Sequence, residues 1–135
     1  MDLTLSQCFV IVHDPDEALN FYRDTLGLEV RNDVANEGYR WITVGSPAQP
    51  NIAIVLTNYL NGSPADLDLV AGLVAKGALP GVHFQTGDLD GSFEKVRAAG
   101  AEIVQEPTEQ FWGTKDFAVR DPSGNMVRVD QPPAG

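Results

Sequence analysis

Arg120-Asp121-Pro122-Ser123-Gly124-Asn125 is the stretch of sequence that decides the fold. It lies between two runs with the character of strands, residues 115–119 and 126–130. An aspartate carboxylate accepts a hydrogen bond from the backbone two residues on, proline fixes its own φ, and Gly124 and Asn125 tolerate positive φ. The stretch therefore predicts a β-hairpin.

The hairpin closes the second of two similar passages. The first has a strand at 7–12, a helix from Asp14 to Gly27, and extended runs up to residue 58. The second has a strand at 81–86, a helix from Asp88 to Gly100, and extended runs at 101–105, 115–119 and 126–130. We interpret this as a β-α-β-β-β unit that occurs twice, too few times for a solenoid. Two such units can complete one another's sheet.

Turn and capping residues predict the remaining connections. Ser63-Pro64 opens a helix in the linker between the two units, and Gly77 ends it. The polar run 31–38 is expected to form a loop, and the run 106–113 to form a long irregular connection. Trp112 near the end of that connection is a candidate lid over a cavity, although ordinary loop packing explains it equally well.

Composition limits the classes of function. The chain has 135 residues, nine basic and nineteen acidic, and a net charge of -10. This charge repels phosphate backbones and anionic membrane surfaces, so neither nucleic acid nor a membrane is expected as a partner. No apolar run has membrane-spanning length, and a cytoplasmic protein is expected. Cys8, the single cysteine, allows no internal disulfide and is expected to be a buried thiol.

Three ordered motifs resemble the vicinal oxygen chelate superfamily, which holds glyoxalases, bleomycin-resistance proteins and extradiol dioxygenases. The motifs are Asp14-Pro15 followed by residues 20–28, Asp88-Leu89-Asp90 followed by residues 98–101, and residues 121–125. The resemblance implies an α+β fold in which two βαβββ modules form a curled eight-stranded mixed sheet around a cavity. It implies one domain over 1–135, with module one at about 6–58, a helical linker at about 59–80 and module two at about 81–131. It also implies a homodimer.

Metal-dependent members of this superfamily hold a divalent ion with ligands from the first and last strands of each module. Those positions fall here on Gln7, Val55, Gly81 and Arg128, of which only Gln7 offers a suitable oxygen. No cofactor is therefore expected. The alternative is a divalent metal at a site shifted by two residues, held by Gln7, His83 and Asp130. Such a shift moves a ligand by roughly 6.5 Å.

Strand alternation and the resemblance together predict a small-molecule pocket. Its candidate ligand-binding residues are Gln7, Phe9, Ile11, His83, Gln85, Trp112 and Arg128. If Arg128 is unpaired, the ligand must be anionic, whereas pairing with Asp130 or another carboxylate allows a neutral or cationic ligand.

The leading hypothesis is a protein that binds or sequesters a drug or metabolite without metal, as in the bleomycin-resistance branch. The alternative is a glyoxalase-, dioxygenase- or isomerase-like enzyme with a rearranged or metal-free site, for which His83 is the candidate acid or base. A third possibility is an interaction module whose cavity is vestigial.

Overall fold

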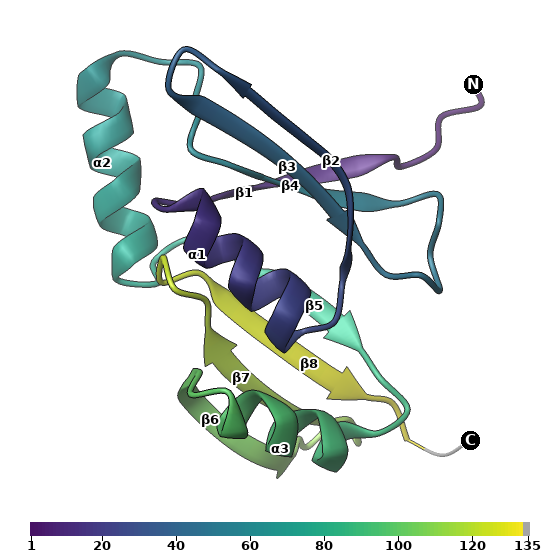
Figure 1. Cartoon of the computed structure of the whole chain (residues 1–135). Helices are drawn as coiled ribbons and strands as arrows, with labels where there is room; N and C mark the ends of the chain where they lie inside the picture. The colour runs from purple at the N-terminus through teal and green to yellow at the C-terminus, as the bar shows by residue number, and fades with distance from the viewer. Residues whose placement is uncertain (134–135) are drawn as a thin grey trace. The chain divides into compact units, whose positions relative to one another are not determined.

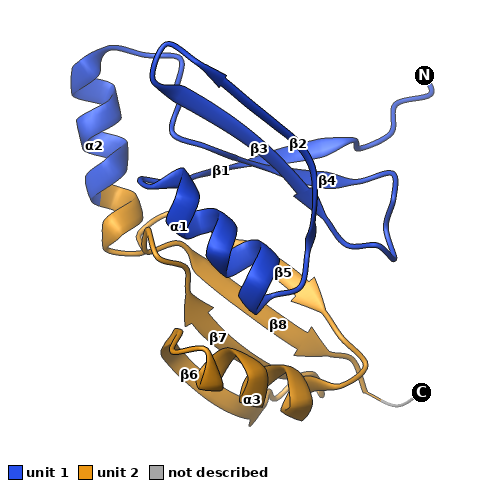
Figure 2. Cartoon of the chain, viewed as in Figure 1, with its two compact units in different colours: residues 1–72 blue, residues 73–135 orange. Residues whose placement is uncertain are grey.

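The computed structural model describes residues 1–133, which form parts of two compact units, Met1–Gly72 and Leu73–Gly135. Figure 2 shows that the boundary between the units falls inside one helix, α2 (Pro64–Ala75). The last two residues of the predicted domain, Ala134 and Gly135, lie outside the described part. The division into two modules and a linker at the predicted bounds stays a prediction.

The first unit holds a four-stranded mixed sheet in the order β1-β4-β3-β2. Strands β1 and β4 are parallel, and the other neighbours are antiparallel. Its elements are β1 (Gln7–Ile11), α1 (Pro15–Leu19), the π-helical turn η1 (Asn20–Thr25), β2 (Glu29–Asn36), β3 (Tyr39–Gly45), β4 (Ala53–Thr57) and the start of α2 (Figure 1).

Local chemistry fixes the first helix as the sequence predicts. The carboxylate of Asp14 accepts hydrogen bonds from the backbone N–H groups of Asp16 at 3.0 Å and Glu17 at 3.2 Å. Gly27 ends the helical segment with a φ of 78°, a conformation open to glycine. The helix buries Ala18, Phe21 and Tyr22 in a core that also contains Ile42, Val44 and Leu56.

The first half of β1 is exposed, whereas the sequence predicts a strand that is buried on both faces. Helix α1 packs against β3 and β4, and Cys8 and Phe9 are exposed, Phe9 by 59% of its surface. The prediction that Cys8 is a buried thiol was wrong, because its strand lies at the edge of the sheet, away from this helix. Val12, just beyond the strand, is 1% exposed and belongs to the core.

The prediction that residues 31–38 form a loop was also wrong, because most of this run is strand β2. Glu37 and Gly38 form a two-residue turn in which both φ angles are positive, 52° and 82°, and such turns join paired strands. Arg31 holds the strand by donating to the carbonyl oxygens of Ile52 at 2.6 Å and Ser46 at 2.9 Å. The polar residues of β2 suit an edge strand that faces water.

Glu37 is the one non-glycine residue with positive φ among those described. Because a left-handed conformation disfavours a side chain, Glu37→Gly is expected to raise the free energy of unfolding by about 0.5–1 kcal/mol. Urea denaturation at pH 7 measures the change. The control is Glu109→Gly at the end of strand β6, where glycine should destabilise the protein. A loss of stability in Glu37→Gly would contradict the prediction.

The second unit repeats the arrangement with a four-stranded mixed sheet in the order β5-β8-β7-β6. Its core contains Phe93 and Phe117, whose ring centroids are 5.4 Å apart. The α+β class and the two βαβββ units are thus confirmed, with the eight strands divided between two sheets. The elements are β5 (Val82–Gln85), α3 (Leu89–Ala98), β6 (Glu102–Glu109), β7 (Lys115–Arg120) and β8 (Met126–Gln131).

The hairpin between β7 and β8 forms as predicted, but β6 is longer than expected. It continues to Glu109 through most of the run that was predicted to be irregular. A register shift between Gln105 and Thr108 places Pro107 where the ladder is interrupted, so its missing N–H does not end the strand. Within residues 1–133, every helix is too short or too polar to span a bilayer.

Candidate functional site: a polar pocket in the second unit

The second sheet has one apolar face and one polar face. Phe84, Val129 and Phe117 lie in register across β5, β8 and β7 on the face that forms the core with α3. Side chains alternate between faces along a strand, so His83, Arg128 and Ala118 share the other face, as do Gln85, Asp130 and Asp116. The register therefore gathers several polar side chains on one surface.

This polar face forms the floor of a pocket of about 560 Å³, with Trp112 beside it. Of the ligand-binding residues predicted from sequence, His83, Trp112 and Arg128 line the pocket and Gln85 does not. Gln7, Phe9 and Ile11 belong to the first unit, on the sheet face that carries Val55, and their part in ligand binding stays a prediction. The lining residues are His83, Gln105, Gln110, Trp112, Thr114, Asp116, Arg128 and Asp130.

Asp116 contacts three other residues of the pocket, and the sequence analysis did not identify it as a site residue. Its side chain is 5% exposed, and its Oδ1 accepts hydrogen bonds from the Nε2 atoms of Gln105 at 2.7 Å and Gln110 at 2.8 Å. Burial acts to raise the pKa of the Asp116 carboxyl. The hydrogen bonds from Gln110 and Gln105 and the charge of Arg128 outweigh burial and lower that pKa below its ordinary value. Asp116 is therefore held as a carboxylate.

Asp116 also neutralises Arg128. The Nη1 atom of Arg128 lies 3.2 Å from Oδ2 of Asp116 and 3.2 Å from Oε1 of Gln105. The sequence left two alternatives for Arg128, an unpaired cation or a cation paired with a carboxylate, and the structure shows the second. The carboxylate that pairs with it comes from the neighbouring strand β7.

Asp130, unlike Asp116, has a buried carboxylate oxygen that accepts no hydrogen bond from the described residues. Its carboxylate also lines the pocket, yet its Oδ1 is buried and has no hydrogen-bond partner within the described part of the chain. Register places Asp130 directly opposite Asp116, so two carboxylates neighbour each other across the ladder. The pocket thus contains one satisfied carboxylate and one that is not.

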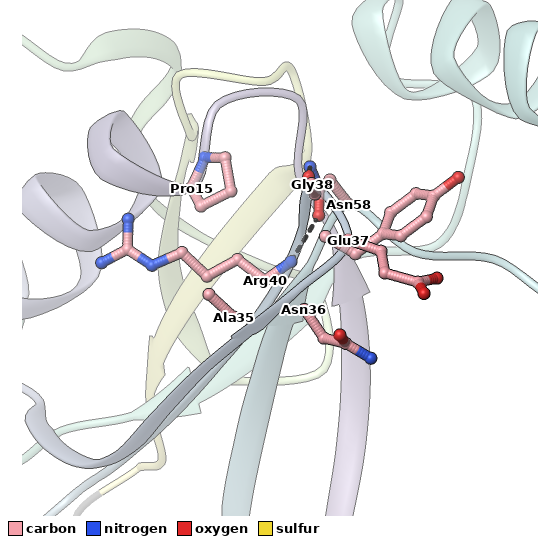
Figure 3. Close-up of a pocket in the computed structure, with 8 residues that line it drawn as sticks. Pro15, Ala35, Asn36, Glu37, Gly38, Arg40 and Asn58 are labelled. Carbon is pink, nitrogen blue, oxygen red and sulfur yellow. Dashed lines mark hydrogen bonds between the residues drawn. The ribbon is translucent and has the colours of Figure 1, made fainter.

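A second, smaller pocket of about 400 Å³ lies in the first unit, beside the turn between β2 and β3. Figure 3 shows Pro15, Ala35 and Arg40 around it. The guanidinium of Arg40 is paired with Asp33 at 2.7 Å and with Asp16, and its backbone N–H donates to Asn58. Because its cation is already paired twice, this pocket is the weaker candidate.

Three side chains that can donate to a metal ion, His83, Asp116 and Asp130, line the larger pocket. Residues 1–133 contain no group of three or more His, Cys, Asp or Glu side chains placed to hold one. His83 and Asp130 both line the pocket, but Gln7, the third member of the shifted site, belongs to the first unit. At Gly81, a side chain would collide with the backbone carbonyl of Met126, so this position cannot carry a ligand without backbone movement.

Comparison with known proteins agrees with the fold and the repeated unit. The family model described as "Glyoxalase/Bleomycin resistance protein/Dioxygenase superfamily" matches residues 4–129. A "Probable lactoylglutathione lyase" from Synechocystis sp. (strain ATCC 27184 / PCC 6803 / Kazusa) is 28% identical over 131 residues, 94% of each chain.

Two solved structures cover nearly the whole chain. UcmS2 has a TM-score of 0.86 and 32% identity, over 96% of this chain and 98% of that one. TnmS3, described as an antibiotic binding protein from Streptomyces sp. CB03234, has a TM-score of 0.74 and 24% identity, over 97% of both chains.

Proposed function

Because the chain belongs to the Glyoxalase/Bleomycin resistance protein/Dioxygenase superfamily, we propose that the pocket of its second unit binds a small organic molecule. Binding or sequestration of a drug or metabolite, without chemical conversion, is the function that this geometry supports best. The proposal includes the predicted cytoplasmic location and homodimer.

The observation that carries the proposal is a preformed pocket with an accessible aromatic wall. A volume of about 560 Å³ is in the range of sites for drug-sized ligands. Trp112 is 58% exposed, which leaves part of its ring available to stack on a ligand. Asp116, Arg128 and Gln105 already bond one another, so ligand binding does not have to order them.

The relatives point in two directions. The description of TnmS3 as antibiotic-binding supports sequestration, although at 24% identity the likeness establishes only the fold. The lyase relative supports the enzyme alternative. The position of His83 and Asp130 around one pocket also supports it, because a histidine and a carboxylate are the usual acid and base groups.

Ligand binding is tested by a thermal-shift screen of aromatic antibiotics, followed by calorimetry of each hit. Loss of a stacking ring is worth roughly tenfold in affinity, so Trp112→Ala should weaken each hit by that factor. The control is Phe111→Ala, since Phe111 is 97% exposed and outside the pocket lining. The ring centroids of Phe111 and Trp112 are 4.8 Å apart in an edge-to-face contact. Phe111→Ala is therefore expected to reduce the affinity by a smaller factor than Trp112→Ala. Equal affinities of wild type and Trp112→Ala would contradict the proposal.

The metal-dependent form of the enzyme alternative is tested by elemental analysis. Protein purified without chelator is incubated with nickel, manganese, zinc or ferrous iron and then desalted. We expect no stoichiometric metal, because residues 1–133 contain no group of three or more donor side chains placed to hold an ion. Stoichiometric metal that is lost in His83→Ala would favour the enzyme and justify glyoxalase and ring-cleavage assays.

A further inference from the structure

The unsatisfied carboxylate of Asp130 indicates which chemical class of ligand the pocket selects. Its Oδ1 is buried without a hydrogen-bond donor among the described residues, although the side chain lines the pocket. A buried acceptor without a donor destabilises a protein, and a charged one more so. A cation brought into the pocket by a ligand would reduce the part of that penalty that comes from the charge.

The charges around Asp130 decide what kind of donor fits. Asp116 lies directly across the ladder from Asp130, and Gln85 lies opposite it on the other side. Arg128, the cation of this pocket, is committed to Asp116 and Gln105. Two carboxylates and one guanidinium leave the pocket with an excess of one negative charge when His83 is neutral. A cation is therefore favoured and a carboxylate or phosphate is repelled.

We propose, on the basis of the function proposed above, that the ligand carries a protonated amine that binds Asp130 while its aromatic body stacks on Trp112. Asp130 lines the pocket and its two carboxylate oxygens share one negative charge, so an ammonium group in the pocket interacts with that charge even where Oδ1 itself stays covered. The net charge of -10 also favours the approach of a cation.

Three indoles that differ in charge test this selection. Tryptamine is cationic, tryptophol is neutral and indole-3-acetate is anionic. Each is titrated into the full-length protein by calorimetry in the presence of EDTA, which removes any bridging metal. Amide chemical shifts then report where each indole binds. We expect tryptamine to bind at the pocket residues at least tenfold more tightly than indole-3-acetate, with tryptophol between them.

Asp130→Asn should weaken tryptamine binding about tenfold and leave tryptophol nearly unchanged, because only the charge-assisted bond is lost. The matched control is Asp68→Asn, which removes the same charge from an exposed position on α2, outside the pocket. Thermal unfolding of both variants without ligand verifies that each is folded. A stability of Asp130→Asn equal to or above wild type is expected, since an unsatisfied carboxylate is removed.

The possible failures are distinguishable. If indole-3-acetate binds the pocket as tightly as tryptamine, or if both aspartate variants bind tryptamine like wild type, the amine selection is overturned and ligand binding stands. If no indole shifts any pocket residue, both the amine selection and the binding function assigned to this pocket are overturned.

Discussion

Asp121→Ala is expected to lower the free energy of unfolding by about 3–5 kcal/mol. The Oδ1 atom of Asp121 accepts from the backbone N–H groups of Ser123, Gly124 and Asn125 at 2.9–3.0 Å. Its Oδ2 accepts from the side-chain amide of Asn125 at 2.9 Å. Asp121 is 4% exposed, so alanine would leave these donors buried and without this acceptor.

Two variants isolate the cause of this loss. Asp88→Ala removes a carboxylate that accepts from Gly91 at an exposed helix start, and about 1 kcal/mol is expected there. Asp121→Asn keeps one acceptor oxygen but places its own NH₂ group against the NH₂ group of Asn125. Its loss of unfolding free energy is therefore expected to lie between those of the other two variants. Urea denaturation at pH 7, followed by circular dichroism, gives all three values. A loss in Asp121→Ala no larger than in Asp88→Ala would show that the turn does not depend on this carboxylate.

The hairpin was predictable because its chemistry is local. Aspartate, proline and glycine specify the turn whatever surrounds it, and Gly124 has a φ of 109°. The structure adds a close approach, since a side chain on Gly124 would lie 2.5 Å from the carbonyl oxygen of Val74. In contrast, the polar strand β2 depends on hydrogen bonds from Arg31 to carbonyl groups fifteen or more residues away, which no local pattern reveals.

The pocket was predictable only in part. Strand alternation placed His83 and Arg128 on one face, which the register confirms. The charge of the pocket was not predictable, because it depends on how many carboxylates line the pocket, and Asp116 was not among the predicted residues. Asp130, on the same strand as Arg128, was the carboxylate named from sequence, whereas Asp116 on β7 forms the contact. Alternation along 115–119 could have identified Asp116, but not its pairing.

Asp116→Asn is expected to lower the free energy of unfolding by about 2–4 kcal/mol at pH 7, because no orientation of the new amide satisfies its neighbours. If the amide oxygen faces Gln105 and Gln110, its NH₂ group meets the guanidinium of Arg128. If it is turned over, the NH₂ group meets the two glutamine amides. Gln105 cannot simply flip in response, since its Oε1 already accepts from Arg128.

The control for Asp116→Asn is Asp24→Asn, which breaks an exposed pair with Arg23 in which the Asp24 side chain is 57% exposed. Exposed pairs contribute little, and a change much smaller than that of Asp116→Asn is expected. Equal effects of the two substitutions would mean that the Asp116 network does not stabilise the second unit.

The effect of Asp116→Asn should also depend on pH. Hydrogen bonds from Gln110 and Gln105 and the charge of Arg128 lower the pKa of Asp116 despite the opposing effect of burial. A carboxyl whose pKa is lower in the folded state stabilises the protein above its unfolded pKa of about 4, and that stabilisation is lost as the pH falls through the folded pKa. The difference between wild type and Asp116→Asn should therefore be largest near pH 7 and shrink below about pH 4. Urea denaturation at several pH values measures it, and a difference that stays constant down to pH 2 would mean that the charge of Asp116 contributes nothing and only its shape matters.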